Sequence, residues 1–212
     1  SPIRTRTRIR RQAARVRRRG THGQRRLRNQ RNAQGRGRTK HGFDRLLSAL
    51  PAALDKPRSE RILEGAFNAV SRELGNAVGY DSIVASGPHA PILHWMRNTG
   101  VVKTGDMLLV DAGVEVDSLY TADITRTFPT NGKFTDFQKR LYQAVLDSQQ
   151  AGFEAAKPGA TYSDIHHACM RVIAERLHDW GLLPVSVEES LSPQGQQHRR
   201  WPRLRRGPPL GS

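Results

Sequence analysis

Residues 107–129, MLLVDAGVEVDSLYTADITRTFP, decide the fold that the sequence predicts for this chain. The stretch begins with an apolar run and continues with the alternating Val114 and Val116. After a polar break it resumes with Ile124 and Phe128. Two apolar segments separated by a short polar turn indicate two antiparallel strands. The stretch therefore predicts a β-hairpin.

Two aspartates, Asp111 and Asp123, lie twelve positions apart in this hairpin. A turn centred on Asp117 would place them directly opposite each other on one face, with their Cβ atoms roughly 5 Å apart. Carboxylates that close on an inward face need protons, cations or a metal, because unpaired buried charge is costly. Carboxylate oxygens suit hard divalent cations, and a two-metal site holds its ions about 3.5 to 4 Å apart. The pair therefore predicts a metal site.

Four segments of the sequence resemble a known family when they are taken together. Their order and spacing are similar to those of the pita-bread metallopeptidases, specifically the Xaa-Pro aminopeptidase (aminopeptidase P) branch. The resemblance runs from about Thr39 to Trp201 and implies an incomplete pita-bread fold, an α/β (α+β) fold with a curved, mainly antiparallel sheet covered by helices. The segments are GYDSIVASG at 79–87, ILHW at 92–95, DAG at 111–113 and ADITRTFP at 122–129.

The resemblance also implies a site and a reaction. Asp111 and Asp123, with a histidine and two glutamates from further along the chain, would bind two divalent metal ions, usually manganese. The metals would act as Lewis acids on a peptide with proline at its second position, from which the first residue is released. The spacing of the two aspartates in the family is one residue shorter, so the extra residue is expected in the turn or in a bulge.

His94 is the expected catalytic residue. Residue type alone favours a packed histidine beside Trp95, but the resemblance places His94 where the family has a histidine that contacts the substrate and the developing tetrahedral intermediate. Tyr80 also occupies a motif position. Because an aromatic residue at the start of a strand usually packs in the core, Tyr80 is placed outside the site.

The segment after Trp201, PRLRRGPPLGS, holds neither the expected His-Gly motif nor the two later glutamates. The chain is therefore expected to be a fragment with two of the five metal ligands, to bind metal only partially, and to be inactive as it stands. A prolidase or another pita-bread hydrolase is the nearest alternative, since the aspartates are common to these enzymes.

The charge is concentrated at the two ends of the chain. Residues 1–40 hold fifteen Arg and one Lys with no acidic residue, which equals the net charge of +16 of the whole protein. We expect a disordered Arg-rich arm at 1–39, a partial catalytic domain at 40–201 and a disordered basic tail at 202–212. Such an arm favours RNA or DNA through release of counterions, which gives a second alternative, a non-catalytic pita-bread protein that binds RNA. The same composition is typical of a GC-rich gene translated out of frame.

Cysteine content and hydropathy point to a cellular compartment. Cys169 is the single cysteine, which excludes an internal disulfide, and no apolar run is long enough for a signal peptide or a membrane helix. We therefore expect a cytoplasmic protein without a membrane partner. The resemblance is compatible with a homo-oligomer.

The remaining pattern predicts the elements around the hairpin. Apolar spacing indicates helices near 43–50 and 59–74, and a capping box formed by Thr135 and Gln138 predicts a further helix. Another helix should begin near Tyr162 and stop at Gly181. Strands are expected at 80–86 and 91–95.

Overall fold

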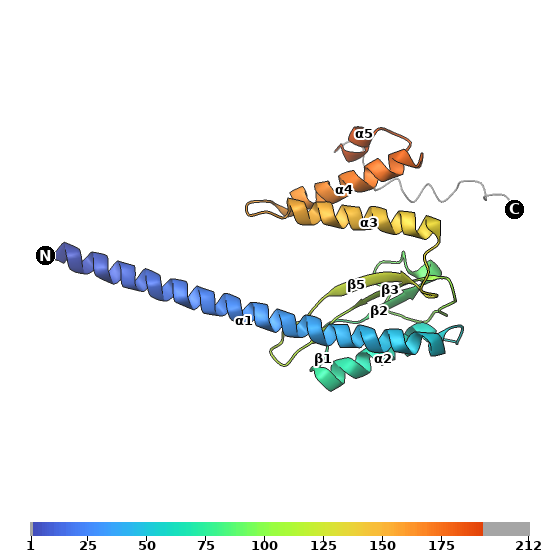
Figure 1. The fold of residues 1–212 in the computed structure, drawn as a ribbon, viewed down its shortest axis with the longest axis horizontal. Helices are drawn as coiled ribbons and strands as arrows, with labels where there is room; N and C mark the ends of the chain where they lie inside the picture. The colour runs from blue at the N-terminus through green and yellow to red at the C-terminus, as the bar shows by residue number, and fades with distance from the viewer. Residues whose placement is uncertain (1, 193–212) are drawn as a thin grey trace. The chain divides into compact units, whose positions relative to one another are not determined.

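The computed structural model describes residues 2–192 of the chain, with side chains described from residue 24 onward. The expected basic tail at 202–212 therefore lies outside the described residues. The chain divides into two compact units, Ser1–Lys133 and Phe134–Ser212. They are called unit 1 and unit 2 here, and each is described by itself (Figure 1).

Unit 1 contains two helices, five strands and a short 3-10 helix. Its elements in chain order are α1 (Pro2–Ala53), α2 (Ser59–Leu74), β1 (Ala77–Val78), β2 (Ile83–Ser86), η1 (Gly87–His89), β3 (Met107–Ala112), β4 (Val114–Glu115) and β5 (Ile124–Pro129). Unit 2 is helical over its described residues and consists of α3 (Asp136–Ala155), α4 (Tyr162–Asp179) and α5 (Val187–Leu191).

The central sheet of unit 1 has three antiparallel strands in the order β2-β3-β5, and β1 pairs with β4 in a separate ribbon. The predicted hairpin is thus present as β3 and β5. Burial alternates along β3, so that Leu108, Val110 and Ala112 face the core while the residues between them are only partly covered. This period of two is the pattern expected of a sheet with one buried face.

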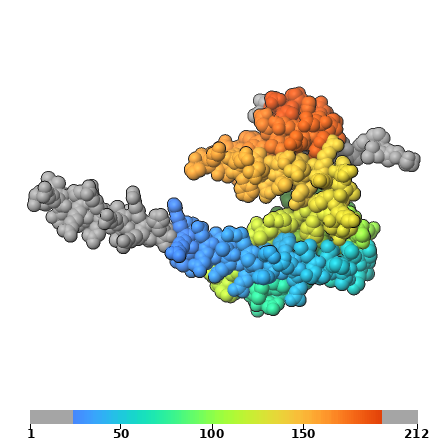
Figure 2. All heavy atoms as spheres, in the orientation of Figure 1, coloured from blue at the N-terminus to red at the C-terminus, as the bar shows by residue number. Residues whose placement is uncertain are grey.

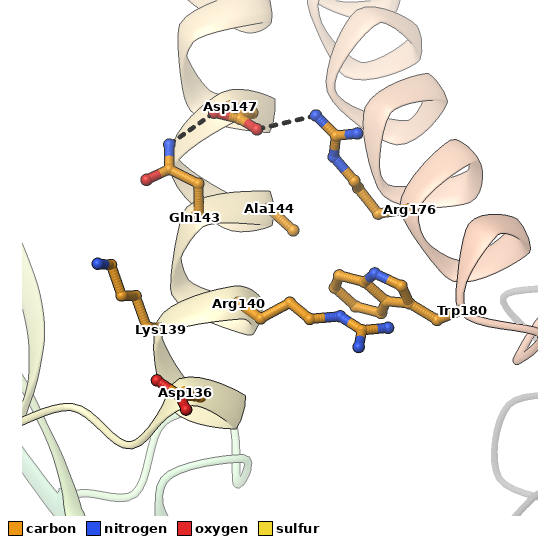
Figure 3. Close-up of a pocket in the computed structure, with 8 residues that line it drawn as sticks. All are labelled: Asp136, Lys139, Arg140, Gln143, Ala144, Asp147, Arg176 and Trp180. Carbon is orange, nitrogen blue, oxygen red and sulfur yellow. Dashed lines mark hydrogen bonds and ion pairs between the residues drawn. The ribbon is translucent and has the colours of Figure 1, made fainter.

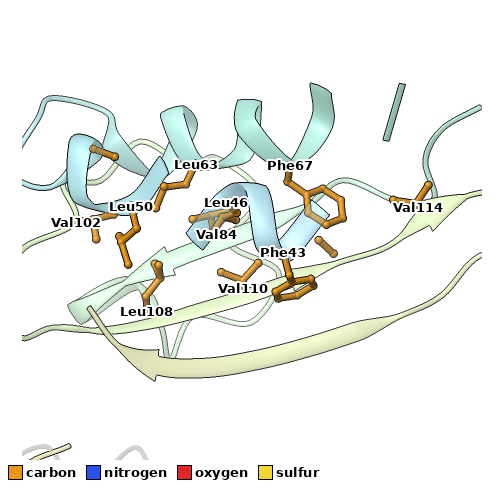
Figure 4. Close-up of a cluster of buried hydrophobic side chains, with 12 residues drawn as sticks. Phe43, Leu46, Leu50, Leu63, Phe67, Val84, Val102, Leu108, Val110 and Val114 are labelled. Atoms are coloured by element: carbon orange, nitrogen blue, oxygen red, sulfur yellow. The ribbon is translucent and has the colours of Figure 1, made fainter. Parts of the chain in front are cut away.

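The core lies between this face of the sheet and the two helices (Figure 4). Phe43 of α1 meets Phe67 of α2 edge to face, with ring centroids 5.8 Å apart, a favoured geometry for aromatic pairs. The labelled residues come from α1, α2, β2, β3 and the segments beside them: Phe43, Leu46, Leu50, Leu63, Phe67, Val84, Val102, Leu108, Val110 and Val114. The helical faces predicted near 43–50 and 59–74 therefore supply the helix side of the core.

Helix α1 is much longer than the sequence predicts. The segment expected to be a disordered arm up to residue 39 is part of one helix that begins at Pro2, in keeping with the high helix propensity of Arg and Gln. Packing also begins before residue 40. The guanidinium of Arg31 lies 5.6 Å from the ring centroid of Tyr120, Arg38 donates to the carbonyl of Leu74, and the buried Oγ1 of Thr39 accepts from the amide of Val114 at 2.9 Å.

Unit 2 begins as the sequence predicts. The side chain of Thr135 caps the amide of Gln138, and the Gln138 side chain accepts from the amide of Thr135 in return. Helix α4 has a second capping box, formed by Thr161 and Asp164, and Gly181 beyond its end has a φ of +69°. No helix among residues 2–192 is both long and apolar enough to cross a membrane.

Candidate metal centre

The register of the hairpin decides how the two aspartates meet. Asp111 pairs with Thr125 and Ala112 pairs with Ile124, so the prediction that Asp111 lies directly opposite Asp123 is wrong by two positions. Asp123, which immediately precedes β5, is instead a diagonal neighbour of Asp111. A shift of two preserves the face to which a side chain points, because strand side chains alternate with a period of two.

The reason for the shift lies in the turn. The amide of Val116 donates to the carbonyl of Tyr120 at 2.9 Å, and the amide of Leu119 donates to the carbonyl of Val116 at 2.7 Å. The turn is therefore centred on Ser118 rather than on Asp117. Leu119 takes a φ of +63°, a left-handed conformation that a non-glycine residue seldom adopts and that sequence alone does not reveal.

Tyr80 brings the two carboxylates to one point. Its hydroxyl lies 2.6 Å from Oδ1 of Asp111 and 3.0 Å from Oδ1 of Asp123. A single hydroxyl hydrogen can be donated fully to one carboxylate at a time, so the tyrosine is shared between them. Burial raises the pKa of Tyr80 above its ordinary value, and the hydrogen bonds and negative charges of the two aspartates raise it further. Placing Tyr80 outside the site on residue type was therefore mistaken geometrically, and its position in the 79–87 motif was the available signal.

Gly113 sets how closely the two sides of the hairpin approach beside this cluster. A Cβ atom at this position would lie only 1.7 Å from the carbonyl oxygen of Ala122, so no other residue fits without a backbone shift. The carbonyl of Gly113 also accepts from the amide of Gly79 at 2.8 Å. The segment before Tyr80 is thereby tied to the segment that follows Asp111.

His94 lies in a loop rather than in the strand predicted at 91–95. Its side chain is exposed and its φ is +56°, another left-handed conformation. Among the described residues, His94 makes no side-chain hydrogen bond or ion pair with Asp111 or Asp123. The structure therefore unites the two aspartates with Tyr80 and presents His94 separately on the loop.

The chemistry of this cluster fits part of a metal site. Asp111 is half-buried and Asp123 is exposed, so the pair of carboxylates is open to a cation from solvent. Oxygen ligands of this kind favour hard divalent ions. Within residues 24–192, whose side chains the structure describes, however, no three residues among the histidines, cysteines, aspartates and glutamates gather closely enough to hold a metal ion. The described residues thus offer two carboxylate ligands and a hydroxyl that orients them.

Most of the chain resembles known proteins. Residues 38–199 match the model of metallopeptidase family M24. The chain belongs to this family. Xaa-Pro aminopeptidase 1 of Streptomyces coelicolor is 51% identical over 163 residues, which cover 77% of this chain and 32% of that protein. Xaa-Pro aminopeptidase 2 of the same organism is 49% identical over 152 residues, which cover 72% of this chain and 32% of that protein.

Solved aminopeptidase structures share the fold. Aminopeptidase PepP of Pseudomonas aeruginosa superposes with a TM-score of 0.70 at 33% identity. The matched residues cover 81% of this chain and 37% of the PepP chain. Zinc-substituted Escherichia coli aminopeptidase P in complex with product gives a TM-score of 0.67 at 31% identity, with 80% and 37% covered. The mixed α/β architecture, with small antiparallel sheets and helices, is that of the pita-bread fold. This M24 chain spans about a third of the length of the relatives it matches.

A hollow of about 440 Å³ lies within unit 2, between α3 and α4 (Figure 3). Three of its charged groups, those of Arg140, Asp147 and Arg176, have partners within the hollow. Arg176 donates to Asp147 at 3.1 Å, and the guanidinium of Arg140 lies 4.7 Å from the ring centroid of Trp180. Asp147 accepts from Gln143 as well, and these bonds lower the pKa of Asp147, that from Gln143 most. The hollow lies at the contact of two helices, where these three charges are paired, and we assign it no ligand.

Proposed function

We propose that this M24 chain carries part of the active site of an Xaa-Pro aminopeptidase, which hydrolyses the peptide bond between the first residue and a proline at the second position. The observation that carries the proposal is the convergence of Asp111 and Asp123 on the hydroxyl of Tyr80. Two relatives named Xaa-Pro aminopeptidase, about half identical over the matched residues, support this substrate class over that of a prolidase.

Asp111 and Asp123 would hold two divalent metal ions, for which manganese is our choice. When bound, the metals would supply Lewis acidity at the scissile peptide bond. Tyr80 holds the Oδ1 atoms of both aspartates toward one point, the task of a residue that orients ligands. His94, exposed on its loop, would contact the substrate and the tetrahedral intermediate with its imidazole.

The chain as it stands should perform this chemistry poorly. Two carboxylates leave most of the coordination of a pair of metal ions to water, and affinity falls as the number and charge of the protein ligands fall. We therefore propose weak, sub-stoichiometric manganese binding and turnover near background. Location in the cytoplasm and the oligomeric state stay predictions from the sequence.

Calorimetric titration with manganese and an assay on an Xaa-Pro-Xaa peptide test the proposal on the same preparation. Asp111→Ala should abolish the weak binding, whereas Asp117→Ala, in the exposed turn of the same hairpin, should leave it unchanged. Two tightly bound manganese ions per chain, or release of the first residue at a rate that falls in His94→Ala, would show a more complete site than proposed. Manganese binding that survives Asp111→Ala would remove the hairpin from the metal site altogether.

One observation favours a second candidate function, the binding of RNA by α1. Residues 1–43 contain no acidic residue, and the side chains of Arg25, Arg26, Arg28 and Arg36 are exposed along the described part of the helix. Figure 2 shows this part of α1 at the surface of the molecule. A row of exposed guanidinium groups on one helix is the electrostatic pattern that phosphate backbones bind.

A further inference from the structure

The carboxylate of Glu60 is fully buried, although it lies in the first turn of α2. A buried carboxylate is costly unless its oxygens are hydrogen-bonded. Both oxygens of Glu60 are fully engaged. Oε1 accepts from the amide of Ser86 at 2.9 Å and lies 2.9 Å from Nδ1 of His89. Oε2 accepts from the indole of Trp95 at 2.9 Å and from the amide of Gly100 at 2.6 Å.

All four of these contacts reach one segment, residues 86–100, which we call the His94 loop. The contacts follow the loop in order: Ser86 ends β2, His89 lies in η1, Trp95 follows His94, and Gly100 ends the loop. A single side chain therefore holds the loop at points spread over its whole length. The rings of His89 and Trp95 are stacked, with centroids 4.0 Å apart, so the two aromatic partners of Glu60 also support each other.

The space around the carboxylate admits little change. A Cβ atom on Gly100 would lie 2.6 Å from Oε1 of Glu60 and 2.6 Å from Nδ1 of His89. The backbone of Gly100 also accepts from the amide of Glu60 at 3.3 Å, so the two residues are bonded in both directions. Close approach of the loop backbone to the carboxylate thus requires glycine at this position.

Other residues hold the loop beyond His94. The guanidinium of Arg61 in α2 donates two hydrogen bonds to the carbonyl of Arg97, each at 3.1 Å. The Asn98 side chain, fully buried, accepts from the amide of Val84 at 3.0 Å and donates to the carbonyl of Ser82 at 2.9 Å. Ser59 accepts from the amide of Val102 at 2.6 Å. Helix α2 thus reaches the part of the loop around His94 through Arg61 at the Arg97 carbonyl and through Glu60 at the Trp95 indole, and the indole lies only one position beyond His94.

His94 itself needs such support. It is exposed, and its φ of +56° is a conformation that non-glycine residues hold only when their surroundings impose it. The carbonyl of His94 accepts from the amide of Met96 at 2.9 Å, a tight local turn around Trp95. Fixing the Trp95 indole therefore fixes the backbone from which the His94 imidazole projects.

We propose that Glu60 is the positioning residue of His94, holding the imidazole in place for substrate through Trp95 and His89. This assignment rests on the proposed function, because it gives His94 its role toward a peptide substrate. Glu60 does not touch the substrate and acts entirely through the loop.

The test compares Glu60→Gln with Glu64→Gln, the same substitution one turn further along α2. Glutamine keeps the shape of the side chain but places an amide group, which donates, against the donors that the carboxylate accepted. The readouts are the NMR signals of the His94 ring, assigned with His94→Ala, and the solvent exchange of the Trp95 indole proton, assigned with Trp95→Phe. In Glu60→Gln we expect the His94 signals to shift toward those of a free histidine and the Trp95 proton to lose its protection, while Glu64→Gln changes neither.

Amide exchange in β3 and β5 serves as the measure of the rest of unit 1. Changes confined to the loop support the proposal, and changes spread equally through β3 and β5 overturn it, because Glu60 would then stabilise the fold in general. His94 signals that stay at their wild-type positions in Glu60→Gln also overturn it. If Glu60→Gln does not fold, Trp95→Phe takes its place, since it removes the indole donor alone and should shift the His94 signals by itself.

A peptide titration separates this proposal from the proposed function. Added Ala-Pro-Ala should shift the His94 signals of the wild type and should bind more weakly to Glu60→Gln. A peptide that leaves His94 unaffected in the wild type overturns the catalytic role proposed for His94, whereas the anchoring by Glu60 is judged from the loop signals alone. Equal peptide binding by the wild type and Glu60→Gln overturns the positioning role.

Discussion

At the scale of single residues, the hydroxyl of Tyr80 is shared between two acidic side chains that lie close together. Asp111 and Asp123 would repel each other, and a donor placed between their Oδ1 atoms offsets part of that repulsion. The same bonds aim both carboxylates at one point. A cation that binds there therefore meets ligands that are already oriented.

Tyr80→Phe should weaken manganese binding about tenfold, at the lower end of the loss that follows when a residue orienting metal ligands is removed. Tyr162→Phe is the matched control, because the side chain of Tyr162 is 85% exposed. Titration calorimetry of the two variants beside the wild type gives the comparison. Unchanged affinity in Tyr80→Phe would mean that the hydroxyl does not orient the metal ligands.

The sequence could propose Asp111, Asp123 and His94 because each lies in a contiguous motif, and their roles stay predictions. It could not place Tyr80, since the hydroxyl finds its partners only when three segments, before β2, in β3 and before β5, come together. The burial and the contacts of Glu60 could not be predicted for the same reason. Its four partners lie 26 to 40 positions further along the chain, and no local pattern marks a glutamate as buried.

At the scale of secondary-structure elements, helix ends were the most predictable features. Thr135 and Gln138 form the expected capping box, because the motif acts within four consecutive residues. The strand predicted at 91–95 is wrong, because the buried carboxylate of Glu60 holds this apolar segment as a loop. The hairpin was predicted, but its register depends on the left-handed Leu119, which no propensity indicates.

The capping box of α4 gives a prediction for the dependence of stability on pH. The amide of Thr161 donates to Asp164 at 2.7 Å and its hydroxyl donates at 2.8 Å, and these two bonds, the amide first, lower the pKa of Asp164 below its ordinary value of 3.8. A lowered pKa means that the folded state favours the ionised carboxylate. Its contribution to stability is therefore present above about pH 4 and is lost as the pH falls below that value.

Asp164→Asn should accordingly reduce the thermal stability of α4 at pH 7 and have a smaller effect near pH 2.5, which lies below the ordinary pKa of 3.8. Circular dichroism melts at the two pH values measure the difference. Glu175→Gln, an exposed residue of the same helix, provides the control and should show no such dependence. A loss of stability in Asp164→Asn that is equal at both pH values would contradict a role for the charge.

At the scale of the whole molecule, helix α1 joins two regions of opposite character. From Phe43 onward it supplies core residues to unit 1, while its first forty residues hold the entire net charge of the protein. The family match begins at residue 38, close to the buried Thr39, whose hydroxyl accepts a hydrogen bond from the amide of Val114. Composition could therefore locate the boundary between the basic region and the packed region. It could not show that one helix continues across this boundary, because helix formation in the basic region depends on its attachment to a packed helix.

The basic region gives the last prediction. If α1 binds RNA, the four exposed arginines at 25, 26, 28 and 36 should each neutralise one phosphate. The logarithm of the affinity should then fall linearly with the logarithm of the salt concentration, and on single-stranded RNA these four residues should contribute about 3 to the magnitude of the slope. Replacing all four by glutamine should weaken binding on every sequence tested and reduce the slope by that amount. Replacing Gln24, Asn29, Gln30 and Asn32 by alanine on the same helix leaves the charge unchanged and should leave the slope unchanged.

Binding that is absent, or insensitive to salt, would remove the RNA function and favour the other origin of this composition, translation out of frame. In that case the DNA before codon 39, read in another frame, should encode a sequence with both acidic and apolar residues leading into the helix at His41.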